Sequence, residues 1–235
     1  MTDMLSLEGL KASYGAAQVL DNVSFAVRRG AVTALLGRNG AGKSSTFKAI
    51  IGLIEREGSV RFLGREIGAE PTYRIARSGL GYVPEDRRIF TELTVEENLE
   101  VGRRSPRADA PRWTPEKIYA LFPNLAEMRR RAGGVMSGGE QQMLTIGRTL
   151  MGNPLLLMLD EPSEGLAPRI VEQMARAILD LKRAGLSLLV SEQNLHFARL
   201  IADEAVILER GGVRFVGTFE DLEAQPALRD AYLAV

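Results

Sequence analysis

Residues 37–44 carry the clearest chemical pattern in the chain, a glycine-rich run spelled GRNGAGKS. An apolar segment, residues 31–36, precedes this run, and a stretch with helical character, Lys43 to Leu53, follows it. Glycines allow backbone N–H groups to turn inward around an anion, and the N-terminus of a helix adds positive potential. Lys43 offers a mobile charge for phosphate oxygens, and the Ser44 hydroxyl can bind Mg²⁺. A turn that only caps a helix is the alternative, but the strand–loop–helix context favours a phosphate-binding loop.

Two adjacent carboxylates, Asp160 and Glu161, follow five apolar residues, Leu155–Leu159. An exposed turn after a strand could explain one of these acids, but it explains the pair less well. At the end of a buried strand beside a phosphate loop, Asp160 is expected to hold Mg²⁺, directly or through water. Glu161 is expected to lie beside the γ-phosphate and to orient or deprotonate the attacking water.

A third segment, Ser137-Gly138-Gly139-Glu140, precedes a helix-like run. Ser137 and Glu140 have the spacing of a capping box, in which each side chain satisfies a backbone N–H of the other residue. A capping box does not need the two glycines, which lower helix propensity in the first turn. Glycines at a helix N-terminus make sense where an anion must approach the backbone closely.

The elements that must position these groups alternate between strands and helices. We expect early strands at Met4–Leu10 and Val19–Val27, and later ones near Gly58–Leu63 and Leu80–Val83. Residues 94–150 read as mainly helical, with N-caps at Thr94 and Thr114 and an exposed loop over 103–112. After residue 150 the pattern alternates again, which favours a parallel α/β sheet interrupted by a helical insert. The expected elements there are Leu155–Leu159, Pro168–Arg183, Leu186–Val190, Asn194–Ala202, Ala205–Leu208 and Val213–Val216.

Composition excludes several other classes of protein. The 235 residues are 45% apolar, which is enough for the core of one domain, and 30 basic residues balance 30 acidic ones. A net charge of zero argues against a nucleic-acid-binding protein with a strongly basic surface. Cysteine is absent and His196 is the single histidine, so disulfides, thiolate nucleophiles and cysteine or poly-histidine metal sites are excluded. We find no signal peptide and no apolar run of membrane-spanning length, and expect a soluble cytoplasmic protein.

The three motifs, in their order along the chain, resemble those of ATP-binding cassette (ABC) ATPases. Residues 37–44 correspond to Walker A, 137–142 to the signature motif and 155–161 to Walker B. The resemblance implies a P-loop NTPase (RecA-like) parallel-sheet core with an N-terminal antiparallel β subdomain and a helical insert. Residues 1–91 and 151–235 would form the nucleotide-binding core, and 92–150 the helical subdomain. ATP and Mg²⁺ are the implied cofactors.

Further positions follow from the same resemblance. Tyr14 would stack on adenine, although a strand-end tyrosine is the alternative. Glu85 stands where most members carry the glutamine of the Q-loop, and Leu166 removes the usual aspartate of the D-loop, residues 163–166. Gln193 stands where most members carry the switch histidine; it can donate a hydrogen bond but cannot carry a proton near neutral pH. His196 is interpreted as an ordinary helix residue.

The implied site is therefore explicit. Catalysis is assigned to Glu161, Lys43, Gln193 and Glu85, and Mg²⁺ binding to Ser44, Glu85 and Asp160. Contacts with ATP are assigned to Tyr14, Gly37, Arg38, Asn39, Gly40, Ala41, Gly42, Lys43, Ser44, Ser45, Ser137, Gly138, Gly139 and Glu140.

The departures from the common pattern also resemble the bacterial ATPase subunits of branched-chain amino-acid importers. Importers of urea and short-chain amides remain open, as do, less favoured, a non-transport ABC ATPase and a small-molecule kinase. The resemblance implies a head-to-tail pair with a second ABC ATPase subunit, identical or related, and with ATP bound between the two. It also implies integral membrane permease subunits and, indirectly, a periplasmic solute-binding protein, with the chain on the inner face of the bacterial plasma membrane. The permease would dock near Glu85–Leu99, including Phe90, whose alternative is a buried core position.

Overall fold

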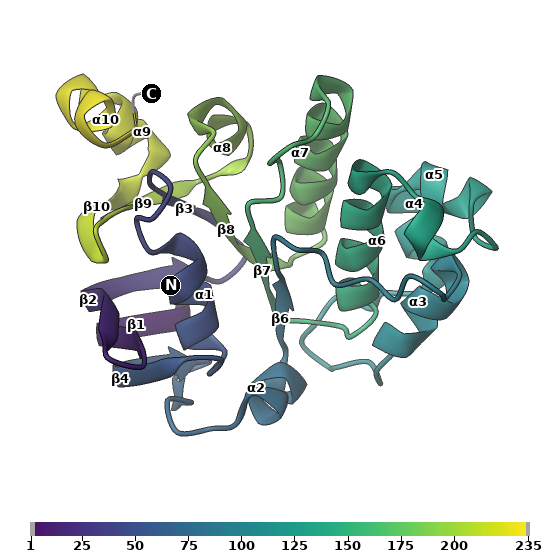
Figure 1. The fold of residues 1–235 in the computed structure, drawn as a ribbon, viewed down its shortest axis with the longest axis horizontal. Coiled ribbons are helices and arrows are strands. Elements are labelled where there is room, and N and C mark those ends of the chain that lie inside the picture. The colour runs from purple at the N-terminus through teal and green to yellow at the C-terminus, as the bar shows by residue number, and fades with distance from the viewer. Residues whose placement is uncertain (1–2, 234–235) are drawn as a thin grey trace.

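Two β-sheets organise the chain, as the computed structural model shows for residues 3–233 (Figure 1). The first sheet has four antiparallel strands in the order β2-β1-β4-β5. Its strands are β1 (Asp3–Tyr14), β2 (Ala17–Arg28), β4 (Glu55–Phe62) and the short β5 (Arg65–Glu66). Leu5, Leu7 and Leu10 of β1 are buried on its core-facing side. This sheet is the N-terminal antiparallel unit that the resemblance implied.

The second sheet has six strands in the order β10-β9-β3-β8-β7-β6. Its strands are β3 (Val32–Leu36), β6 (Leu80–Val83), β7 (Leu156–Asp160), β8 (Ser187–Glu192), β9 (Glu204–Glu209) and β10 (Gly212–Thr218). All neighbours are parallel except β10, which folds back on β9 as an antiparallel edge. Strands β3, β7 and β8 are buried along their whole length, which explains their nearly continuous apolar sequences. Because these three strands are adjacent and parallel, their carboxyl ends meet at one edge.

Helix α1 (Lys43–Ile50) contacts strands of both sheets and so joins them. Its Phe47 and Ile50 are completely buried. The sequence prediction extended this helix to Leu53, but the helix ends earlier, and Gly52 takes a left-handed turn with φ 76°. The remaining helices outside the insert are α2 (Thr72–Ser78), α7 (Pro168–Arg183), α8 (Leu195–Ile201), α9 (Phe219–Glu223) and α10 (Pro226–Leu233).

The helical insert lies to one side of the six-stranded sheet, drawn in teal in Figure 1. It contains α3 (Val95–Gly102), α4 (Pro115–Leu121), α5 (Pro123–Glu127), a 3₁₀ turn (Gly133–Val135) and α6 (Gly138–Leu150). The predicted N-caps are confirmed: Thr94 forms a capping box with Glu97, and Thr114 caps α4 ahead of Pro115. Residues 103–112 form the predicted loop between α3 and α4. Buried residues of the helical insert, including Ile118 of α4 and Leu125 of α5, pack against α6 and belong to the same hydrophobic core cluster.

The short elements β5, α2, α9 and α10 were not predicted. Each spans eight residues or fewer, so none contains enough periodic apolar positions to be recognised from sequence. Across residues 3–233, no helix has the length and apolarity that crossing a membrane would require.

Candidate functional site

The phosphate loop lies between the end of β3 and the start of α1, in the context predicted from sequence. Gly37 must be a glycine for steric reasons, because a Cβ there would lie 2.5 Å from the carbonyl oxygen of Leu208. Gly42 is the N-cap of α1 and has a left-handed φ of 108°, which favours glycine as well. The two glycines therefore allow the loop to pack closely between β3 and α1.

Lys43 reaches back across this loop. Its Nζ donates to the carbonyl oxygens of Gly37 (2.8 Å) and Arg38 (3.2 Å) and lies 3.0 Å from Oε1 of Glu161. Only 3% of the Lys43 side chain and 6% of the Glu161 side chain are exposed. The two groups that the sequence assigned to phosphate and to water are therefore in direct contact.

Asp160 lies at the end of β7 and collects three hydroxyl donors. Its Oδ1 accepts from Ser44 Oγ at 3.0 Å and from Ser191 Oγ at 2.6 Å, and its Oδ2 accepts from Tyr82 Oη at 3.1 Å. Burial raises the pKa of Asp160 above its usual value, and these hydrogen bonds oppose the rise. Burial also raises the pKa of Tyr82, with Asp160 adding to the effect.

The Ser44 hydroxyl and the Asp160 carboxylate have the chemistry that a Mg²⁺ site needs. Mg²⁺ is commonly held by one or two carboxylates together with phosphate oxygens and water, so one hydroxyl and one carboxylate side by side are a suitable donor set. Within the described residues, 3–233, no group of three or more histidine or acidic side chains could hold a metal by itself. The residues present therefore fit a cation shared with a phosphate ligand.

Glu161 has a left-handed backbone with φ 47°, which is uncommon for a residue other than glycine. Its N–H donates to both the backbone oxygen (3.2 Å) and the side-chain oxygen (3.0 Å) of Ser191. Strand β8 thus fixes the turn that aims Glu161 at Lys43. Such strain is tolerated where the surrounding structure holds it, and it is concentrated at functional sites.

A cavity of about 690 Å³ opens over the phosphate loop and brings together residues from five separate segments. Glu85, Glu161, Lys43 and Ser44 all line it, as predicted for one site, and so does Ser45. Hydrogen bonding to the Glu161 carboxylate raises the pKa of Glu164 to about 7. Three lining residues have no role in the sequence analysis, Gln18, Val19 and Arg210, and Glu164 belongs to the segment assigned to the D-loop.

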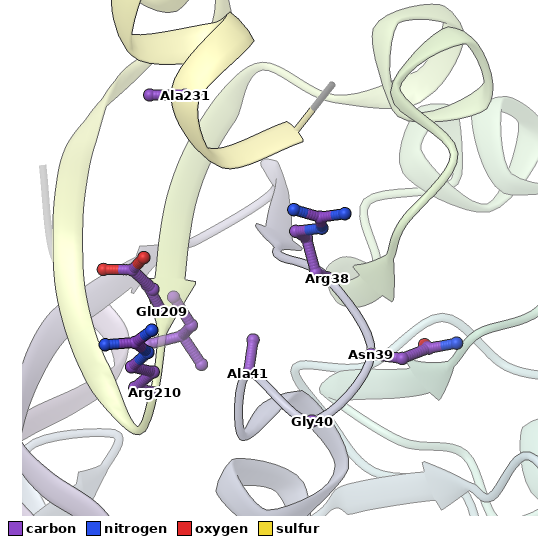
Figure 2. A pocket seen from close by; sticks show the side chains of 8 residues that line it. Arg38, Asn39, Gly40, Ala41, Glu209, Arg210 and Ala231 are labelled. Carbon is purple, nitrogen blue, oxygen red and sulfur yellow. The ribbon is translucent and has the colours of Figure 1, made fainter. Parts of the chain in front are cut away.

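The other side of the phosphate loop borders a smaller cavity of about 250 Å³ (Figure 2). Arg38 and Ala41 face it, together with Glu209 and Arg210 of the β9–β10 turn and Ala231 of α10. Asn39 and Gly40 border both cavities. Arg38 is therefore placed on the side of α10, away from the larger cavity.

Three other predicted positions lie at the periphery. Tyr14 is the last residue of β1, and it is 45% exposed. The described residues of the β1–β2 hairpin that line the larger cavity are Gln18 and Val19. Gln193 is exposed just after β8, and His196 is exposed in the first turn of α8. Neither of these two side chains is among the described residues that line the larger cavity.

Glu192, the last residue of β8, is a site residue that sequence analysis did not identify. Its side chain is almost completely buried and accepts from the backbone N–H groups of Ser163 (3.1 Å) and Asn194 (3.4 Å). Burial raises the pKa of Glu192 to about 7. The carboxyl group thereby joins the loop after Glu161 to the loop that carries Gln193. An acid at the end of a predicted buried strand, in the same kind of place as Asp160, was the signal that could have revealed it.

The Ser137–Glu140 capping box is confirmed at the start of α6. Ser137 Oγ accepts from the N–H of Glu140 at 3.4 Å, and Glu140 Oε2 accepts from the N–H of Ser137 at 2.7 Å. Gly139 allows close packing on α7, because a Cβ there would lie 2.9 Å from Cγ2 of Ile170. These residues are not among the described residues that line either phosphate-loop cavity. The predicted ATP contacts are therefore divided between two places on one chain.

Phe90 is 48% exposed, so the surface alternative is confirmed over the buried one. Its ring stacks against the Arg148 guanidinium, whose carbon lies 5.0 Å from the ring centre.

Comparisons with known proteins agree with this geometry. Residues 20–164 match the family model described as ABC transporter. The high-affinity branched-chain amino acid transport ATP-binding protein BraG of Pseudomonas aeruginosa is 43% identical over 98% of this chain and 99% of its own length. The lipopolysaccharide export system ATP-binding protein LptB of Haemophilus influenzae is 33% identical over 98% of this chain and 97% of its own. A solved structure of an ATP-binding subunit of an ABC transporter has a TM-score of 0.81 at 32% identity, covering 98% of this chain and 96% of that one.

The raised pKa of Glu192 predicts a pH-dependent stability. The folded protein holds the Glu192 proton more tightly than the unfolded chain does. The contribution of this proton to the free energy of unfolding is therefore complete below about pH 4.5 and is lost as the pH rises through 7. Glu192→Gln keeps an acceptor for Ser163 without a charge. We expect it to raise the free energy of unfolding at pH 8 by about 1–3 kcal/mol and to flatten the pH dependence.

Chemical denaturation between pH 4.5 and 8 measures this effect, with the exposed Glu220→Gln as control. A Glu192→Gln protein that keeps the wild-type slope with pH would contradict the assignment.

Proposed function

This chain belongs to the ABC transporter family as an ATP-hydrolysing translocase subunit, and we propose that it powers the uptake of branched-chain amino acids through a membrane permease. The observation that carries the proposal is the 43% identity with BraG across nearly the whole of both chains. The exporter subunit LptB is similar over the same length but only 33% identical, which favours the importer. The alternative importer, for urea or short-chain amides, has the same ATPase chemistry.

The phosphate end of ATP is proposed to lie in the larger cavity, over the backbone N–H groups that precede α1. Lys43 would exchange its carbonyl contacts for the β- and γ-phosphates, since a triphosphate is a stronger partner for an ammonium than backbone carbonyls. Ser44 and Asp160 would hold Mg²⁺, with Glu85 beside them. When bound there, Mg²⁺ neutralises charge on the phosphates. The adenine would lie toward Tyr14 and Val19 on the β1–β2 hairpin.

Glu161 is proposed as the residue that orients or deprotonates the attacking water. It is buried at the edge of the cavity, within 3.0 Å of the lysine that would bind the γ-phosphate. Entry of the phosphate would draw Lys43 away and leave the carboxylate free to accept from water. Gln193 lies between the buried Glu192 and Asn194, whose N–H donates to the Glu192 carboxylate. It would donate a hydrogen bond to the γ-phosphate in place of the usual histidine.

The separation of the signature residues from the cavity supports a head-to-tail pair. Residues 137–140 would complete the site of a second subunit, identical or related, while that subunit completes the site of this chain. ATP would then contact both halves only in the closed pair, and its binding energy would favour closure because a ligand shifts an equilibrium by its differential affinity. Hydrolysis would remove the γ-phosphate contact and allow the pair to open.

The permease is proposed to dock on the surface around Phe90. This residue is exposed and lies on the segment between Glu85, which lines the cavity, and α3. The segment is also bonded to α6, since Thr145 Oγ1 donates to the Arg87 carbonyl oxygen at 2.9 Å. Residues 92–150 would move as a unit and pass nucleotide-driven motion to the permease on the inner face of the membrane. The periplasmic solute-binding protein would act on the other side.

Glu161→Gln tests the proposed hydrolysis directly. We expect ATP binding to persist and turnover to fall by about 10²-fold or more, because the glutamine cannot accept a proton. ATP should then trap a dimer, which analytical ultracentrifugation would detect. Unchanged turnover would remove Glu161 from its role, and slow turnover without a dimer would contradict the shared site.

Gln193→Ala and His196→Ala test which residue replaces the switch histidine. The two side chains lie three positions apart, and both are exposed. We expect Gln193→Ala to lower kcat by about tenfold and His196→Ala to change it little, because only Gln193 follows the strand end beside Glu161. The reverse order in a steady-state ATPase assay would show that His196 is the switch.

Uptake of labelled solutes identifies the cargo. In cells that lack this chain, we expect uptake of leucine, isoleucine and valine to be restored by the wild-type gene and not by the Glu161→Gln variant. Urea and acetamide uptake should be the same with and without the chain. Restoration of urea uptake alone would support the alternative importer.

A further inference from the structure

We propose that Arg87 is a further ATP-contacting residue, which supplies a positive charge to the triphosphate held by the partner subunit. The inference rests on the head-to-tail site of the proposed function and adds to it a residue outside the three motifs. Its basis is the placement of the Arg87 side chain directly on the signature glycine Gly138.

The Nη atoms of the Arg87 guanidinium lie against Gly138. If Gly138 carried a Cβ, that atom would lie 2.8, 3.1 and 3.2 Å from Nη1, Nη2 and Cζ of Arg87. These distances place the Nη end of the guanidinium against the first residue of α6. The absence of a side chain at Gly138 therefore makes room for Arg87, as well as exposing the backbone.

The backbone of Arg87 is fixed to α6 in this position. Its carbonyl oxygen accepts from Thr145 Oγ1 at 2.9 Å, and the next carbonyl, of Arg88, accepts from Arg148 Nη2 at 2.6 Å. Arg87 and Arg88 have φ values of 62° and 50°, so two consecutive residues take the left-handed conformation. The backbone of Arg87 is thus bonded to the signature helix.

Nearby carboxylates are already committed to other groups. Asp86 pairs with Arg88, with Oδ2 2.9 Å from Nε, and Glu140 accepts from the N–H of Ser137. Among residues 3–233, no ion pair involves the Arg87 guanidinium. The guanidinium charge therefore has no carboxylate partner among the described residues, and a guanidinium can bind phosphate oxygens in a bidentate manner.

The proposed ATP site carries more negative charge than the common family pattern, which favours an additional cation. Glu85 adds a carboxylate to the cavity where most family members have an uncharged glutamine, and Gln193 replaces a histidine that can become cationic. Relative to the common pattern, the γ-phosphate of this chain gains a negative neighbour and loses a potential cation. An arginine packed against the opposing signature helix would supply compensating positive charge once the pair has closed.

The test uses the full-length chain with Arg87→Ala, Arg87→Lys and the exposed control Arg130→Ala. In the Glu161→Gln background, we expect Arg87→Ala to raise the ATP concentration for half-maximal dimer formation about tenfold, since a charge-assisted contact is lost. ATP binding measured at protein concentrations below dimerisation should match that of Arg130→Ala. Arg87→Lys should recover part of the loss because it restores the charge.

Mixed pairs distinguish this role from a structural one. When a Lys43→Ala protomer is in excess, most protomers with an intact Lys43 pair with a Lys43→Ala partner. Such a mixed pair has one working site. That site consists of the intact phosphate loop of one protomer and the signature helix of the Lys43→Ala partner. Arg87→Ala on the Lys43→Ala protomer should lower turnover more than Arg87→Ala on the Lys43-bearing protomer. Equal losses from both placements, or a dimer titration that matches Arg130→Ala, would overturn the proposal. If the wild-type chain forms no ATP-dependent pair at all, the shared site itself fails, and the proposal falls with it.

Discussion

The buried ion pair between Lys43 and Glu161 is the interaction on which the site depends. It joins the start of α1 to the residue that follows β7, with only a few per cent of either side chain exposed. Two charges removed from water are stable only when each has a close partner. A ligand that replaces Glu161 as the partner of Lys43 must therefore be anionic. A group that replaces Lys43 as the partner of Glu161 must donate a hydrogen bond. The phosphate and the attacking water of ATP hydrolysis meet these two requirements together.

The topology of the six-stranded sheet creates this pair. Because β3 and β7 both neighbour β8 in parallel, the loops after all three strands emerge at the same edge. Ser191 on β8 hydrogen-bonds both Asp160 and the N–H of Glu161, and Glu192 holds the loops on either side. The same strand thus supports the proposed metal ligand, the proposed base and the approach to Gln193. The hydrogen bonds from β8 do not reach residues 137–140, and these residues do not line the cavity of their own chain. They can contact ATP in the proposed site only if the ATP is bound by a second subunit.

Much of this arrangement could be predicted from local sequence. The buried strands, the glycine-rich loop and the capping boxes at Thr94 and Ser137 each depend on residues a few positions apart, so their patterns are visible in one dimension. Other members of the site depend on distant pairings. Arg210 reaches the cavity because the β9–β10 turn is bonded to the phosphate loop, with Gly211 N–H donating to the Ala41 oxygen at 2.9 Å. The contact of Arg87 with Gly138 likewise depends on a turn of two left-handed arginines, which no local pattern indicates.

The central claim is that nucleotide is bound between two subunits, and the chain offers a direct measurement because it contains no cysteine. Asn39→Cys and Ser137→Cys, introduced on separate copies in the Glu161→Gln background, would report the approach of one phosphate loop to the opposing helix. If nucleotide is bound in this way, we expect a disulfide between the copies that forms with ATP and not with ADP. A dimer that forms with ATP but gives no such disulfide, while each cysteine remains reactive, would contradict it.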